Sequence, residues 1–87
     1  MNAKYVYLIT FRSVTYAQRG ERVLNRAGER ARVQRTPRWM EEQGCGYSLR
    51  LLTGDIARAV SILRGDGLPL RKIYVQLDDG GLEEVTV

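Results

Sequence analysis

Residues 4–28 read KYVYLITFRSVTYAQRGERVLNRAG, and this stretch decides the fold. Its first part, residues 4–11, is rich in aromatic and β-branched side chains and predicts a strand. Both faces of that strand are apolar, which favours a central place in a sheet. Residues 13–27 then put small and apolar side chains on one side of a helical wheel and arginines on the other. They predict an amphipathic helix packed against the sheet.

The ends and the inner side of this helix carry specific signals. Ser13 or Thr15 can cap its start, and Gly28 is a natural stop. Gly20 falls on the inner side, where a glycine costs a helix about 1 kcal/mol relative to alanine. We therefore expect Gly20 to let the helix approach the sheet closely.

The rest of the chain continues the alternation of strands and helices. Residues 53–55 offer caps for a second helix, and residues 78–81, DDGG, are a strong hairpin turn signal. The expected elements are strands at 30–35, 47–52 and 70–77, a helix with the apolar stripe Ile56, Ala59, Val60 and Leu63, and a short last strand within 82–87.

The order β-α-β-β-α-β predicts an α+β protein of the ferredoxin-like type. In that fold an antiparallel sheet of strand order 4-1-3-2 carries both helices on one face. Residues 1–87 are expected to form a single domain, with residues 78–87 as a C-terminal hairpin tail. Either set of side chains on the strand at 4–11 could face the helices. In both cases apolar groups would remain on the open face, which suggests a homodimer or another partner.

Composition excludes several classes of function. The 87 residues include one cysteine and no histidine, so there is no internal disulfide, no cysteine-rich zinc site and no imidazole base. We expect no metal and no cofactor. No apolar run approaches the roughly 20 residues that span a bilayer, and the first residues lack a cleavable signal pattern. These features predict a cytoplasmic protein without a membrane segment, in which the thiol stays reduced.

Charge is distributed unevenly along the chain. Residues 1–40 carry a net charge of +7 and residues 41–87 a net charge of −3, and twelve of the fourteen basic residues are arginine. One explanation of this pattern is that the arginines lie on solvated helix faces. The other is that they form a surface for an acidic partner or nucleic acid, since the arginine fork fits carboxylates and phosphates. Both explanations stay open.

The single thiol belongs to Cys45, in the run Gln43-Gly44-Cys45-Gly46-Tyr47. A lone cysteine is often a small buried hydrophobe. Here glycines on both sides free the backbone and let another molecule approach the sulfur. Arg35 and Arg38 precede it, and a cation near a thiol lowers the thiol pKa. Cys45 is therefore the candidate reactive residue.

The chemistry open to this thiol is limited. Acyl transfer needs a base and an orienting group, and neither has an obvious candidate in the chain. Redox cycling would need a second, resolving cysteine. A carrier of persulfide or selenide needs only an accessible thiol, because its partners can supply the acid–base groups. One cysteine without histidine therefore favours a carrier over a turnover enzyme.

The loop before Cys45 contains Thr36-Pro37-Arg38-Trp39. One interpretation is a turn whose tryptophan anchors the loop to the core. The other is functional: Arg38 would hold an anionic sulfur species or an acidic partner, and Trp39 would shield the thiol from water. The residues leave both possible.

Three motifs in this order resemble the selenium/sulfur carrier protein-like family of short bacterial proteins. They are FRSVTYA at residues 11–17, TPR at residues 36–38 and CGYSLR at residues 45–50. The resemblance implies that Cys45 holds the chalcogen, with Gly44, Gly46, Thr36, Pro37 and Arg38 supporting it. It also implies a cysteine desulfurase-like donor and an acceptor protein. The chain departs from the family pattern at Gly44, where a small polar residue is expected, and at the bulky pair Trp39-Met40.

Two other classes of function fit parts of the sequence. The open sheet face could serve oligomerisation, making the protein an interaction or regulatory subunit. The element order is also that of RNA-binding RRM domains, which stack bases on sheet aromatics. Tyr7 and Tyr47 would be the stacking residues, but the third strand offers too few aromatics, so nucleic acid is the less favoured partner.

Overall fold

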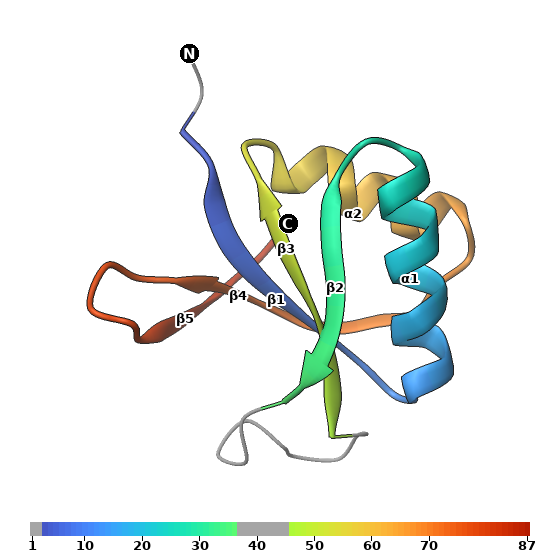
Figure 1. The fold of residues 1–87 in the computed structure, drawn as a ribbon, viewed down its shortest axis with the longest axis horizontal. Helices are drawn as coiled ribbons and strands as arrows, with labels where there is room; N and C mark the ends of the chain where they lie inside the picture. The colour runs from blue at the N-terminus through green and yellow to red at the C-terminus, as the bar shows by residue number, and fades with distance from the viewer. Residues whose placement is uncertain (1–2, 37–45) are drawn as a thin grey trace.

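A computed structural model describes residues 3–36 and 46–87 of the chain. It has two helices and one five-stranded sheet, in the order β-α-β-β-α-β-β (Figure 1). The bounds are β1 Tyr5–Phe11, α1 Val14–Arg26, β2 Arg30–Arg35, β3 Tyr47–Thr53, α2 Ile56–Gly65, β4 Leu70–Gln76 and β5 Leu82–Val85. Each predicted element is present, and its ends shift by one or two residues at most.

The sheet has the order β2-β3-β1-β4-β5, and every neighbouring pair is antiparallel. β1 is central, as its apolar faces predicted, and the first four strands follow the expected 4-1-3-2 order. The four-stranded ferredoxin-like description is nevertheless incomplete, because β5 pairs with β4 and adds a fifth strand at the edge. The turn before β5 closes where the Leu77 N–H donates to the Gly81 carbonyl at 2.8 Å, and Gly80 there has a φ of +87°.

Both helices lie on one face of the sheet, and the β4–β5 hairpin extends beyond them (Figure 1). The core between helices and sheet contains Ile9 and Phe11 of β1 and Leu49 and Leu51 of β3, all at most 1% exposed. Tyr7 packs against the same core. The odd-numbered residues of β1 therefore face the helices, which the sequence had left undecided.

The helix ends and the close helix–sheet contact follow the predicted signals. The Ser13 side chain accepts from the Tyr16 N–H at the start of α1, and the Asp55 side chain accepts from the Arg58 N–H at the start of α2. Gly20 is buried against the core. A Cβ at this position would lie 3.3 Å from atoms of Leu49, Leu63 and Phe11. Close approach is thus the reason for this glycine.

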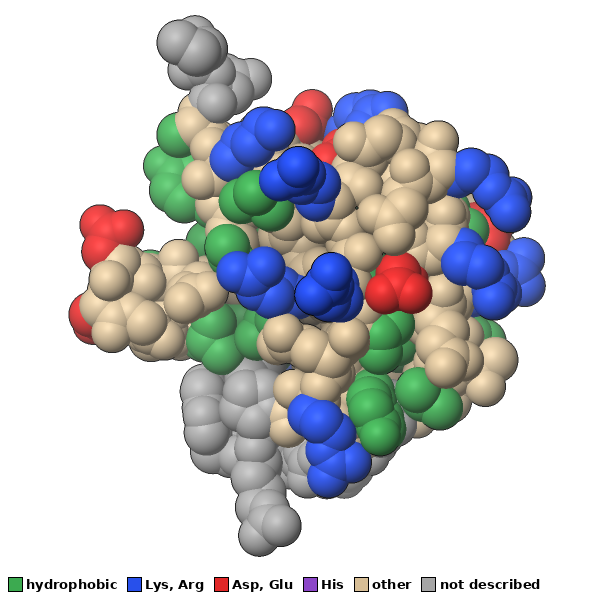
Figure 2. All heavy atoms as spheres, in the orientation of Figure 1, with side chains coloured by type: hydrophobic (Ala, Val, Ile, Leu, Met, Phe, Trp, Pro, Cys, Tyr) green, Lys and Arg blue, Asp and Glu red, His purple; other side chains and the backbone are tan. Residues whose placement is uncertain are grey.

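No helix among the described residues covers the opposite face of the sheet, which bears charged as well as apolar side chains. Side chains paired across the strands form a row on it, which runs Arg32, Arg50, Leu8, Tyr74 and Glu84 from β2 to β5. Figure 2 shows basic side chains gathered over the strands and acidic ones at the tip of the β4–β5 hairpin. Apolar groups are nevertheless present on this face, as expected, because Val6, Leu8 and Leu52 lie on it among arginines.

Candidate functional site

The end of the β2–β3 hairpin is where the sequence placed the site. The Thr36 N–H donates to the Gly46 carbonyl at 2.7 Å, so the two strands remain tied one residue beyond their paired ends. Thr36 is buried and Gly46 is half-buried. The hydrogen bond fixes the two points between which residues 37–45 run.

Of the predicted site residues, the structure places two. Thr36 and Gly46 are brought together by the hydrogen bond just given. Cys45, Gly44, Pro37 and Arg38 lie outside the described residues, as does Trp39. Their assignment stays a prediction from the sequence.

Arg35, predicted to influence the thiol, has a defined partner at the hairpin end. Its guanidinium carbon lies 5.3 Å from the centroid of the Tyr47 ring, and its Nη1 donates to the Tyr47 hydroxyl at 3.5 Å. The two residues are also directly opposite each other in the strand register. A cation over the ring face is attracted to it, so this contact orients the Arg35 side chain beside the point where β3 begins.

Two buried hydroxyls lie near the same end of the hairpin. Thr36 is 6% exposed and Ser48 is 0% exposed, and neither side-chain oxygen has a hydrogen-bond partner among the described residues. Ser48 pairs with Gln34, two residues before Thr36, so both hydroxyl residues lie on the open side of the hairpin. Burying a hydroxyl without a partner costs free energy. Ser48 lies within the CGYSLR motif, but no feature of the sequence indicates that its hydroxyl is buried.

Aromatic side chains are not placed as an RRM-like surface requires. Tyr7 packs against the helix-side core, and Tyr47 alternates with the buried core residues Leu49 and Leu51. Both therefore lie on the face that carries the helices. This placement gives no support to the less favoured RNA-binding alternative, in which Tyr7 and Tyr47 would be the stacking residues.

Residues 3–36 and 46–87 contain no group of three or more His, Cys, Asp or Glu side chains that could hold a metal ion. Neither described helix has the length and apolar character that crossing a bilayer requires.

Comparison with known protein families gives a match over most of the chain. The family model described as "Putative Se/S carrier protein-like" matches residues 6–75. The chain belongs to this family. The match runs from β1 to β4, so the family pattern includes the hairpin and Cys45 but leaves β5 outside. No curated protein and no solved structure matches the chain.

Membership in the Se/S carrier-like family confirms the resemblance read from the three sequence motifs. A carrier works by exchange, so the family implies interaction with partner proteins. It also directs attention to the single cysteine, because sulfur and selenium bind covalently to a thiol.

Proposed function

We propose that this protein carries sulfur or selenium on the thiol of Cys45. It would receive the atom from a cysteine desulfurase-like donor and pass it to an acceptor protein. The observation that carries the proposal is the family match across residues 6–75, a range that includes the chain's one cysteine. The sequence offers no second thiol for the cargo.

The transfer is a balanced displacement. The Cys45 thiolate attacks the terminal sulfur of a donor persulfide, the donor S–S bond breaks, and a new S–S bond forms on Cys45. The donor cysteine leaves as a thiolate, so no external oxidant or reductant is needed. With selenium as cargo, a donor Se–S bond breaks and an Se–S bond forms on Cys45. Since the chain has no histidine, the partners would supply any proton transfer.

The hairpin geometry supports this role. Cys45 directly precedes Gly46, whose carbonyl accepts the 2.7 Å hydrogen bond from Thr36. The cargo residue is therefore one peptide unit from a fixed point on the sheet.

Mass spectrometry tests the proposal. The protein is incubated with a cysteine desulfurase and cysteine without reducing agent. We expect a mass gain of one sulfur on the peptide that contains Cys45, followed by its loss when an acceptor thiol is added. Cys45→Ser is expected to fold normally by circular dichroism and to gain nothing.

Two controls make the result specific. Omitting cysteine removes the sulfur source and should abolish the adduct. Thr15→Ser removes a methyl group from an exposed side chain of α1 and should leave sulfur loading of Cys45 unchanged. An adduct of equal size in Cys45→Ser, or no adduct on the wild-type chain, would refute the carrier proposal.

A further inference from the structure

Three arginines on the open face of the sheet have no partner among the residues that the structure describes. Arg30 and Arg32 of β2 and Arg50 of β3 are exposed. None of the three side chains has a hydrogen bond or ion pair with another described residue. Elsewhere, Arg19 pairs with Asp66 at 2.8 Å and Arg58 with Glu29 at 2.6 Å. Arg19 of α1 and Arg58 of α2 are thus neutralised by acidic residues, whereas Arg30, Arg32 and Arg50 have no such counterion among the described residues.

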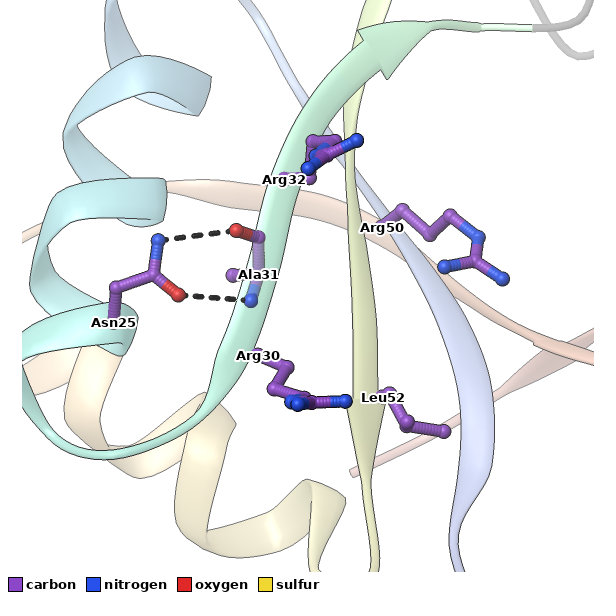
Figure 3. Close-up of a pocket in the computed structure, with 6 residues that line it drawn as sticks. All are labelled: Asn25, Arg30, Ala31, Arg32, Arg50 and Leu52. Carbon is purple, nitrogen blue, oxygen red and sulfur yellow. Dashed lines mark hydrogen bonds between the residues drawn. The ribbon is translucent and has the colours of Figure 1, made fainter.

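The strand register concentrates these charges. Arg32 and Arg50 are directly opposite each other, an arrangement in which like charges destabilise a sheet. Arg30 lies two residues before Arg32 on the same face, about 7 Å away along the strand. All three project from one side of the β2–β3 pair (Figure 3). An anion between them would relieve the repulsion.

A shallow groove accompanies the arginines. It has a volume of about 530 Å³ and is lined by the three arginines together with Asn25, Ala31 and Leu52. Leu52 is an apolar residue of the groove lining and lies opposite Arg30 in the β2–β3 register (Figure 3). Along the row through Arg32 and Arg50, acidic charge begins only at Glu84 on β5, beyond Leu8 and Tyr74. The β2–β3 half of the face is therefore a cationic surface with one apolar side.

The chemistry of the face favours a protein partner over nucleic acid. The guanidinium fork binds carboxylates and phosphates equally well in geometric terms. Binding of single-stranded nucleic acid adds base stacking on several aromatic side chains. The strand residues of the open face provide one, the half-buried Tyr74, because Tyr7 and Tyr47 face the helices. Arginine beside an apolar side chain is instead typical of protein interfaces.

We infer that Arg30, Arg32 and Arg50 form a docking surface for an acidic face of the protein that exchanges the cargo. This inference rests on the proposed carrier function for the identity of the partner. The arginines belong to the two strands that lead into and out of the Cys45 segment. Arg32 lies four residues before Thr36, about 13 Å along the strand. A partner docked there is held on the same hairpin as the thiol.

Nuclear magnetic resonance with an acidic peptide tests the surface directly. The ¹⁵N-labelled protein is titrated with hexaglutamate, and with hexauridylate as the nucleic-acid probe. We expect hexaglutamate to shift amide signals of β2 and β3 and to bind more tightly than hexauridylate. Arg32→Glu/Arg50→Glu should weaken peptide binding by about tenfold or more, because attraction becomes repulsion.

A matched variant separates a defined surface from general charge. Arg22→Glu/Arg26→Glu makes the same change in net charge on exposed positions of α1 and should leave the affinity within about twofold. An equal loss in both variants overturns the inference. So does tighter binding of hexauridylate, which would assign the face to nucleic acid. A wild-type dimer in sedimentation that Arg32→Glu/Arg50→Glu dissociates also overturns it, since a second copy would then occupy the face.

The two proposals can fail separately. Inorganic polysulfide loads a thiol without any docking protein, so loading of the wild-type chain from polysulfide tests the carrier function without a docked partner. If the wild-type chain accepts no sulfur from polysulfide or from a desulfurase, the carrier function fails while the peptide titration still reports on the face. If loading succeeds but hexaglutamate does not bind to β2 and β3, only the docking surface fails.

Discussion

The side chain of Asn25 on α1 holds both backbone polar groups of Ala31 on β2. Its Nδ2 donates to the Ala31 carbonyl at 3.1 Å, and its Oδ1 accepts from the Ala31 N–H at 3.0 Å (Figure 3). Two residues further, the Val33 N–H donates to the Glu21 carboxylate at 2.8 Å. Side chains of α1 are therefore hydrogen-bonded to the backbone N–H and C=O groups on the outer edge of β2, which could otherwise pair with a strand of another chain.

We predict that Asn25→Ala destabilises the protein and exposes this edge. The loss of two hydrogen bonds to groups near the surface should lower the free energy of unfolding by about 1–2 kcal/mol. The freed Ala31 groups should also increase self-association at high concentration. Urea unfolding measures the first effect and sedimentation velocity the second. Gln18→Ala, at an exposed position of α1, is the control. An equal loss of stability in that variant would contradict the role given to Asn25.

Gly20→Ala should destabilise the protein although alanine favours a helix. The new Cβ would lie 3.3 Å from side-chain atoms of Leu49, Leu63 and Phe11, which are themselves fully buried. Overpacking of this kind costs about 1–3 kcal/mol and exceeds the gain in helix propensity, which is about 1 kcal/mol. Thermal unfolding should show a lower Tm.

Gly65→Ala is the matched control for that prediction. Gly65 ends α2, has no atom within 4 Å of an added Cβ, and does not adopt a positive φ. Its replacement should leave the Tm unchanged or raise it slightly. If Gly20→Ala behaves like Gly65→Ala, the close helix–sheet approach is not what requires glycine.

Helix caps and the helix–sheet contact depend on local sequence and could be predicted. The orientation of a strand and its register with its neighbours depend on the folded sheet and could not. The role of Gly20 follows from its position in a helical pattern, and Ser13 and Asp55 are among the capping residues that the same patterns offer. The orientation of β1 was undecided because both of its faces are apolar, and the helices select one only in the folded sheet. The opposition of Arg32 and Arg50 depends on the β2–β3 register across a long connection, which residue spacing does not specify.

The candidate site also combines residues that the sequence identifies with properties that only the folded structure shows. Cys45 was singled out by composition, since a lone thiol needs no structure to be noticed. The burial of Ser48 and Thr36 depends on tertiary packing, and a serine in a strand gives no sign of it. The side of the sheet on which Tyr7 and Tyr47 lie is likewise set by packing, and their alternation with buried Ile9 and Leu49 places them on the helix side.

Replacing the buried hydroxyl of Thr36 should stabilise the fold. Thr36→Val keeps the β-branched shape and removes an oxygen that is buried without a partner among the described residues. The free energy of unfolding should rise by about 1 kcal/mol, within the cost known for unsatisfied polar groups. Thr15→Val, at an exposed site on α1, should give no such gain.

The same Thr36→Val variant can be assayed for sulfur loading at Cys45. A more stable protein that loads more slowly would indicate that the Thr36 hydroxyl is retained for the carrier step. A loss of stability would contradict the prediction, because it would mean that the hydroxyl has a stabilising partner. Ser48→Ala provides a second, independent removal of a buried hydroxyl nearby.

Arg32→Thr should raise stability at low salt. The substitution removes one of two like charges that are directly opposite across β2 and β3 and introduces a residue that favours strands. The expected gain is about 0.5–1 kcal/mol, and it should shrink as added salt screens the repulsion. Arg30→Thr is the control, because Arg30 is opposite Leu52 rather than a charge. Urea unfolding of both variants at low and high sodium chloride measures the difference. If Arg32→Thr gains no more than Arg30→Thr, the opposed arginines do not destabilise the sheet.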